Sequence, residues 1–132
     1  MSDRGLLDTS VFVASESGRP IDGDLLPEQG AVSVVTLAEL QAGVLAARST
    51  EIRAQRMGKL DVLRDIEVLL IDAEVALVWA QLRVSLAEAG RKINFNDLWI
   101  TATAARHGVP VVSQDDDFEA VDGMSGVVVL RV

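Results

Sequence analysis

The chain has 132 residues, the size of one domain, and 49% of them are hydrophobic, which is enough for a packed core. It has no cysteine, which excludes disulfides, zinc–thiolate sites and a thiol nucleophile. The net charge of −8 argues against a broad electrostatic nucleic-acid binder, but not against a nuclease, since metal-binding carboxylates contribute to that charge. Without a signal-peptide pattern or an apolar run of about 18 residues, a single cytoplasmic domain, 1–132, is expected.

The predicted strands and helices alternate along the chain. From the N-terminus, the order is strand 5–7, helix 11–16, short helix 22–26, strand 31–35, helix 36–47 and helix 49–64. It continues with strand 66–71, helix 73–89, helix 96–107, strand 109–112, short helix 116–121 and strand 127–130. Most of these strands are apolar throughout, which is typical of a parallel sheet covered on both faces. The sequence therefore predicts an α/β sandwich.

Acidic residues gather where an open α/β sheet binds ligands, beyond the carboxyl ends of its strands. Asp8 follows the first strand, Glu39 lies in the helix after the second, and Asp97 opens the helix that leads to the fourth. The acids that follow the fourth strand are Asp115, Asp116 and Asp117. Clustered carboxylates need a cation, and hard oxygen ligands select Mg²⁺ or Mn²⁺.

Each acid also has an ordinary structural explanation. Asp8 can cap its own turn, and Asp97 can complement the dipole of its helix. Thr36 and Glu39 have the spacing of a capping box, in which the Glu reaches back to the cap amide. Asp115 or Asp116 can be the N-cap of the last short helix. Both explanations remain open for every one of these residues.

Four segments resemble the motifs of PIN-domain ribonucleases, specifically the VapC-type toxins of type II toxin–antitoxin modules. The segments are Leu7-Asp8-Thr9-Ser10-Val11-Phe12, Val34-Val35-Thr36-Leu37-Ala38-Glu39-Leu40 with Gly43, Asn96-Asp97-Leu98-Trp99-Ile100 with Ala102, Ala104 and Gly108, and Ser113-Gln114-Asp115-Asp116-Asp117-Phe118. The resemblance implies a three-layer α/β/α sandwich with a central parallel five-stranded sheet. It also implies Mg²⁺-dependent endonucleolytic cleavage of RNA, a homodimer, and a cognate antitoxin that plugs the acidic site.

The resemblance also implies a set of site residues. The metal ligands would be Asp8, Glu39, Asp97, Asp115 and Asp117, of which all but the last would also be catalytic. The supporting polar groups would be Thr9, Ser10, Asn96 and Ser113, the last of which replaces the Thr common in the family. Asp116 is extra and is expected to point to solvent, with Phe118 anchoring the loop. The expected reaction is attack by a metal-activated water, whose proton passes to a carboxylate.

Basic residues outside the acidic positions are candidates for contacts with RNA. Five lie between residues 48 and 64, where a solvated helix face is an equally ordinary explanation, and two lie in the loop 90–94. Binding of phosphates by these residues would make the affinity salt dependent. The candidates are Arg48, Arg53, Arg56, Lys59, Arg91 and Lys92. For the antitoxin, the candidate apolar and partly exposed residues are Val11, Leu40, Val44 and Leu45.

Three further residues are assigned structural roles. Trp79 and Trp99 have helical spacing and are assigned to the core. His107, the only histidine, precedes Gly108 and is expected to complement the end of its helix. It would lie about 15 Å along the helix from Asp97, too far to act as its partner.

Two other classes of function compete with the nuclease. A Mg²⁺-dependent phosphatase with an aspartyl nucleophile would need a second Asp two residues after Asp8, where the chain has Ser10. It would also need a Lys near the later acids, as would a phospho-receiver domain, and the chain has none there. The non-enzyme alternative is a catalytically silent PIN-like binding or regulatory module, against which the presence of every expected acid argues.

Overall fold

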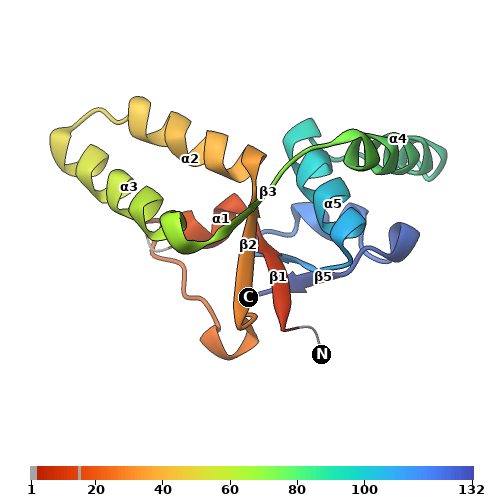
Figure 1. The fold of residues 1–132 in the computed structure, drawn as a ribbon, viewed down its shortest axis with the longest axis horizontal. Coiled ribbons are helices and arrows are strands. Elements are labelled where there is room, and N and C mark those ends of the chain that lie inside the picture. Colours follow the sequence, from red (N-terminus) through yellow and green to blue (C-terminus); the bar gives the residue numbers. More distant parts are fainter. Residues whose placement is uncertain (1–2, 15) are drawn as a thin grey trace.

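The computed structural model describes residues 3–14 and 16–132 and shows one parallel sheet with helices on both sides (Figure 1). The five strands have the order β3-β2-β1-β4-β5 and are all parallel. They are β1 (Arg4–Leu7), β2 (Gln29–Ser33), β3 (Glu67–Leu69), β4 (Val111–Ser113) and β5 (Val129–Arg131). This confirms the predicted three-layer α/β/α sandwich.

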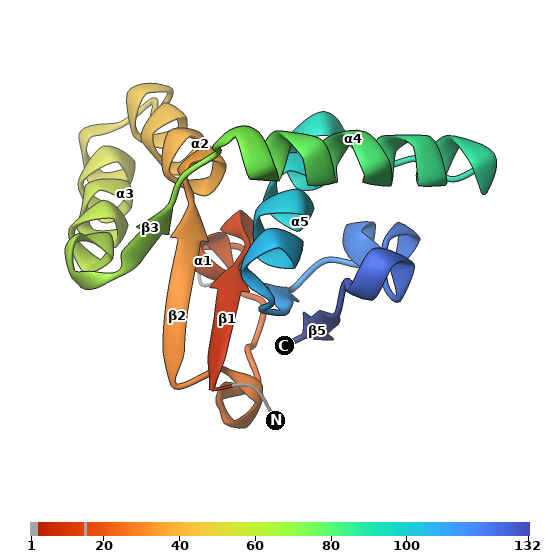
Figure 2. The same ribbon diagram turned by 45° about the vertical axis from the view of Figure 1, so that its right-hand side comes forward.

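The helices form two groups (Figure 2). The first comprises α1 (Thr9–Val13), α2 (Val34–Leu45) and α3 (Thr50–Val62), and the second comprises α4 (Ala73–Glu88) and α5 (Phe95–His107). Short 3₁₀ turns complete the described chain at η1 (Gly23–Leu25), η2 (Leu63–Asp65), η3 (Asp117–Ala120) and η4 (Met124–Gly126). None of the described helices has the length and apolar character needed to cross a membrane.

Each face of the sheet has its own hydrophobic cluster, as the alternation of side chains along a strand requires. In β1, Leu6 packs in the cluster under α4 and α5, whereas the next residue, Leu7, packs in the cluster under α2 and α3. The same division separates Ala31 from Val32 in β2. Trp79 and Trp99 pack against the first cluster with their rings stacked 4.9 Å apart, which confirms their assignment to the core.

Several predicted boundaries were wrong by two or three residues. The first helix covers Thr9–Val13 rather than 11–16, since it begins directly at its cap, Asp8. Helix α2 begins at Val34, because Ser33 is its N-cap and accepts a hydrogen bond from the backbone N–H of Val35 at 3.0 Å. Thr36 is therefore inside the helix, and the capping-box interpretation of Thr36 and Glu39 is incorrect.

The register of the sheet brings the polar ends of three strands to one level. Leu7 is paired with Val112, and Leu6 with Ala31, so that Asp8, Ser113 and Ser33 follow at the same edge. Helix α5 ends at His107, and Gly108 takes the left-handed conformation with φ of 67°, as predicted. Because α5 contacts both β1 and β4, its first turn can reach the same edge.

Candidate active site

Asp8 is held rigidly at the end of β1. It is the N-cap of α1, it is 3% exposed, and its Oδ2 accepts hydrogen bonds from the Ser10 N–H at 3.2 Å and the Ser113 hydroxyl at 3.1 Å. Burial raises the pKa of Asp8 despite these bonds. The capping explanation for Asp8 is thus correct. It does not compete with a functional role, because a carboxylate has a second oxygen.

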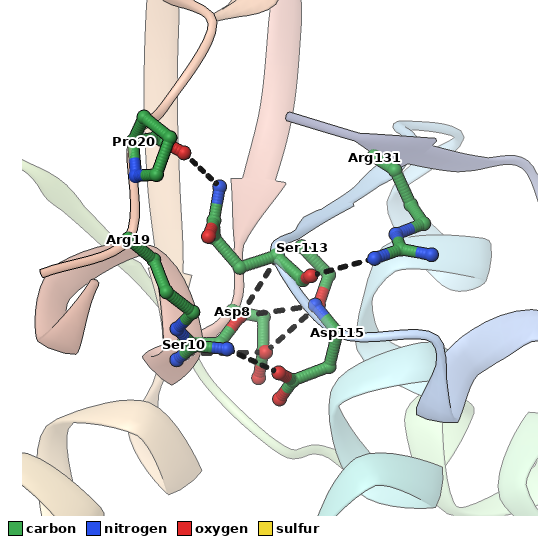
Figure 3. A network of polar contacts seen from close by, with 8 residues as sticks. Asp8, Ser10, Arg19, Pro20, Ser113, Asp115 and Arg131 are labelled. Carbon is green, nitrogen blue, oxygen red and sulfur yellow. Dashed lines mark hydrogen bonds and ion pairs between the residues drawn. The ribbon is translucent and has the colours of Figure 1, made fainter. Parts of the chain in front are cut away.

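Ser113 connects the ends of β1 and β4 (Figure 3). Its hydroxyl donates to Asp8, shares a hydrogen bond of 3.1 Å with the Ser10 hydroxyl, and accepts from the Asp115 N–H at 3.0 Å. The Ser10 hydroxyl in turn accepts from the Gln114 N–H at 2.9 Å. These bonds fix the loop that follows β4 to the loop that follows β1.

Asp97 lies in the first turn of α5 and is 9% exposed. The N-cap of this helix is Asn94, whose side-chain oxygen accepts from the Asp97 N–H at 2.8 Å and whose amide donates to Asp97 Oδ2 at 2.7 Å. Asn96, the residue predicted for this supporting role, lies inside the helix, which begins one residue earlier than predicted. The signal for Asn94 was its position three residues before Asp97, a common spacing for an N-cap.

The electrostatic environment of Asp97 reveals a cluster of acids. Its pKa is raised to about 7, chiefly by burial and then by the negative charges of Asp8, Asp117 and Glu39, against the lowering effect of the hydrogen bond from Asn94. Carboxylates from the segments after β1, β2 and β4 thus lie near enough to Asp97 of α5 to act on its charge. In the described chain, neither Asp8 nor Asp97 forms an ion pair with a basic residue.

Glu39 is placed by the early start of α2. It is half-buried, and its Oε1 accepts a hydrogen bond of 2.7 Å from the hydroxyl of Thr9, the residue after Asp8. The Thr9 hydroxyl also lies 3.3 Å from that of Thr36. Thr9 therefore holds the glutamate on the side of the site where α1 and α2 meet.

The run of three aspartates is divided between two recesses. Asp117 lines a recess of about 360 Å³ together with Asp97 and Asn94. The Asp115 carboxylate instead forms an ion pair of 3.0 Å with Arg19, and both line an open recess of about 610 Å³ that also includes Asp116 (Figure 3). Asp115 does not line the recess of Asp97, and its Oδ1 is engaged by Arg19. Sequence reasoning missed this arginine, because the two residues are 96 positions apart.

The middle aspartate of this run, Asp116, and the phenylalanine that follows the run lie as the sequence suggested. Asp116 is exposed, and although it occupies the cap position of η3, its side chain makes no capping bond. Phe118 is 1% exposed and belongs to the main hydrophobic cluster, so it anchors the loop as expected.

The donor set suits a hard divalent cation held partly through water. Among the residues that the structure describes, no three acidic, histidine or cysteine side chains lie close enough together to enclose an ion. Mg²⁺ does not require this, because it usually keeps several waters and takes one or two carboxylates. Burial and, after it, repulsion by Asp8, Asp117 and Glu39 raise the pKa of Asp97, and a cation would relieve the repulsion.

The basic candidates between residues 48 and 64 have different environments. Arg56 and Lys59 form ion pairs with Glu16 at 2.8 and 3.2 Å, and Arg56 also donates to the Gly43 carbonyl at 2.7 Å. They join α3 to α2 and to the end of α1, and they line a cleft of about 450 Å³ that reaches Glu39. The remaining candidates of this stretch, Arg48 and Arg53, are exposed.

The predicted apolar groove residues are not all accessible. Leu40 and Val44 are 8% and 5% exposed, whereas Leu45 is 71% exposed and Val11 is half-buried. Leu40 does line the cleft beside Glu39. The expectation of partial exposure is therefore wrong for Leu40 and Val44, because they face the sheet from α2.

Comparison with known proteins decides the family. The PIN domain family pattern matches residues 5–124, most of the chain. The chain belongs to the PIN-domain family. This confirms the resemblance predicted from the four motifs, and it places Asp8, Glu39, Asp97 and Asp117 of this PIN domain within the matched segment.

Two curated relatives and one solved structure show how close the likeness is. The PIN domain is 55% identical to Ribonuclease VapC5 of Mycobacterium tuberculosis over 128 residues, which are 97% of this chain and 95% of the relative. It is 40% identical to Ribonuclease VapC4 of the same organism, over 89% of this chain and 91% of that one. The crystal structure of VapBC-5, a member of the VapBC family of toxin–antitoxin systems from M. tuberculosis, matches with a TM-score of 0.92 and 51% identity. This match covers 98% of this chain and 99% of that one.

Proposed function

We propose that this PIN domain is a Mg²⁺-dependent endoribonuclease, the toxin component of a type II toxin–antitoxin module. The observation that carries the proposal is the cluster around Asp97, where burial and the nearby Asp8, Asp117 and Glu39 raise the pKa of Asp97, and where neither Asp8 nor Asp97 has an ion-pair partner in the described chain. The relatives named Ribonuclease VapC5 and VapC4 support the activity. Mg²⁺ is the preferred cofactor and Mn²⁺ the alternative, since both select oxygen ligands.

The protein's own hydrogen bonds prepare three carboxylates for this role. Side-chain donors engage a single oxygen in each: Ser113 on Asp8, Asn94 on Asp97 and Thr9 on Glu39. The second oxygen of each carboxylate is then left to face a cation or its waters, in a fixed orientation. Asp117 completes the set from the loop after β4, whereas Asp115 does not line this recess and is engaged by Arg19.

The chemistry divides between the ion and the chain. Bound Mg²⁺ supplies an acidified water and offsets charge on the scissile phosphate. A carboxylate of the cluster would accept the proton of that water, and a bound cation would favour the charged form of Asp97, whose pKa is raised to about 7 in the metal-free protein. Asp8 and Glu39 hold their orientation through the serine and threonine hydroxyls described above. Without a cation, this group of acids would repel RNA.

The partners follow from the relatives. The neighbouring VapBC-5 structure is a toxin–antitoxin system, which supports a cognate antitoxin as the partner of this chain. RNA is the proposed substrate, and a homodimer and a cytoplasmic location are proposed with it. A catalytically silent PIN-like module is the second candidate, favoured by one observation: Asp115, one of the predicted ligands, is paired with Arg19.

Cleavage of RNA by the purified protein with Mg²⁺ tests the proposal. Asp8→Asn and Asp97→Asn should each lower the initial rate by about 100-fold or more, as expected when a group acting on the reacting water is lost. Glu28→Gln removes an exposed acid from the turn before β2 and should leave the rate unchanged. Chelation of the metal should stop cleavage, and addition of Mg²⁺ should restore it.

Two outcomes would contradict the nuclease. Cleavage that survives both Asn substitutions would come from another site or a contaminant. Absence of cleavage for every RNA offered to the free wild type would favour the silent module. Release of phosphate from p-nitrophenyl phosphate without RNA cleavage would instead favour the phosphatase. Circular dichroism of each variant separates loss of the site from loss of the fold.

A further inference from the structure

A groove of about 390 Å³ lies between α4 and the loop that leads into α5. Its volume is within the range of about 300–1,000 Å³ that ligand pockets usually have. Three basic side chains and an apolar surface line it, the basic ones being Arg83, Arg91 and Lys92 and the apolar ones including Leu86, Ile93 and Leu98. A groove with cations beside apolar side chains is unusual on a chain with a net charge of −8.

The cations of this groove form no ion pair with a carboxylate in the described part of the chain. Seven of the twelve Lys and Arg residues form ion pairs with carboxylates in the described part of the chain. Three of the five that form none there are Arg83, Arg91 and Lys92. The Arg91 guanidinium makes one hydrogen bond, of 3.4 Å to the Ala120 carbonyl, which leaves its charge available. Three of the five cations without an ion pair in the described chain therefore lie at this groove.

An exposed aromatic ring lies beside the groove. Phe95 is 55% exposed, and the Arg83 guanidinium lies 4.9 Å from the centre of its ring. Behind it, Trp79 lies 6.0 Å from Phe95 and stacks on Trp99, so the ring is supported by the core. A supported ring next to a guanidinium is the combination on which proteins stack the bases of single-stranded nucleic acids.

The groove leads directly to the acidic cluster. Lys92 and Ile93 line both the groove and the recess that contains Asp97 and Asp117. Phe95 stands two residues before Asp97 in the first turn of α5. A chain that occupied the groove would therefore enter the acidic recess with its next units.

We propose that this groove binds a single-stranded segment of the RNA substrate next to the cleaved bond. Arg83, Arg91 and Lys92 bind its phosphates, and Phe95 stacks on a base. The inference rests on the proposed function and names the side from which the substrate enters. An acidic peptide could also pair with the cations, but its acidic side chains have no aromatic face to stack on the exposed ring.

Binding of a fluorescein-labelled, unstructured RNA oligonucleotide, measured by anisotropy in EDTA, tests the groove without cleavage. The double variant Arg83→Ala/Lys92→Ala should raise Kd by about tenfold or more, and the slope of log Kd against log salt should fall by about 1.4, since each phosphate contact on a single strand contributes about 0.7. Arg64→Ala removes an exposed charge of α3 and should change Kd by less than about twofold, as an exposed ion pair contributes little.

The ring is tested by two substitutions of similar size. Phe95→Leu should raise Kd by about tenfold, and Phe95→Tyr should restore wild-type binding, because only the second keeps an aromatic face. Thermal unfolding of each variant shows whether the fold is kept. If both ring variants bind alike, or if the double variant binds as the wild type does, the inference is overturned.

The same experiment separates the groove from the nuclease proposal. Asp97→Asn should abolish cleavage and leave binding in EDTA equal or tighter, since one negative charge is lost. A wild type that binds RNA through the groove but never cleaves it would contradict only the nuclease. Absence of RNA binding by the wild type, or tighter binding of an oligo-glutamate peptide that is lost in the same variants, would overturn the groove as an RNA site.

Discussion

Two groups of charged residues lie on either side of Glu39, and they differ in whether a basic residue pairs with the acid. On one side, Glu16 faces Arg56 and Lys59 at 2.8 and 3.2 Å, and hydrogen bonds from these two residues lower its pKa. On the other side, Asp97 is buried among other acids, and its pKa rises to about 7. Both regions consist of charged residues at the same edge of the sheet. They differ in whether the chain supplies the opposite charge.

The difference separates a structural role from a functional one. The Glu16 cluster joins α3 to the rest of the domain and is complete without any ligand. The acids near Asp97 cost stability in the free protein, because buried negative charges repel one another. A protein retains such an arrangement where a ligand offsets the cost, so the uncompensated region is where a cation is expected.

The largest expected effect is the dependence of metal-free stability on pH. The pKa of Asp97 is about 7 in the folded protein and near 3.8 in the unfolded chain, so between these values the folded state binds more protons. Its contribution is therefore present below about pH 4 and is lost as the pH rises to 7, by at most about 4 kcal/mol at 1.36 kcal/mol per pKa unit. Urea unfolding in EDTA from pH 4 to 8 should show this loss in the wild type and much less in Asp97→Asn.

Glu16 provides the opposite case. Its lowered pKa gives a contribution that is present above about pH 4.5 and is lost as the pH falls. Glu16→Gln should therefore be less stable than the wild type at pH 7.5, where Asp97→Asn should be more stable. Equal pH slopes for the wild type and Asp97→Asn would show that the carboxylates are not coupled as described.

Addition of a divalent ion should remove the contrast between the two regions. Mg²⁺ or Mn²⁺ that binds only the folded state stabilises it by about 2.7 kcal/mol at 100 times its Kd. At pH 7.5 the melting temperature of the wild type and of Glu16→Gln should rise with Mg²⁺, while that of Asp97→Asn should rise much less. NaCl at equal ionic strength is the control. The same shift in all three proteins would place the ion elsewhere.

Local patterns predicted those parts of the site that depend on neighbouring residues. The apolar strand before Asp8 and the N-terminal position of Asp97 in its helix could both be read from the sequence, because strand and helix signals lie within a few residues. The start of α2 could not be predicted from the sequence. Val34 and Val35 favour a strand by propensity, yet the Ser33 cap and the packing of the helix on the sheet override this preference.

The long-range parts of the site required the fold. The ion pair between Arg19 and Asp115 joins two loops with no shared pattern, so the three aspartates looked equivalent except for their alternation. The groove beside α5 was also hidden, because Arg83 comes from α4 while Arg91, Lys92 and Phe95 come from the following segment. Sequence spacing does not show that these side chains share one surface.

The smallest expected effect is that of Asp116→Ala. It tests whether the three aspartates of the run contribute differently to cleavage. Asp116 is exposed and makes no capping bond in η3, so its removal should change the rate of Mg²⁺-dependent RNA cleavage by less than about twofold, as is usual for exposed positions. Asp117→Ala should be far more harmful, since Asp117 shares the recess of Asp97. Initial rates for the three alanine variants give the order. A loss in Asp116→Ala as large as that in Asp115→Ala would show that Asp116 is not the dispensable carboxylate of the run.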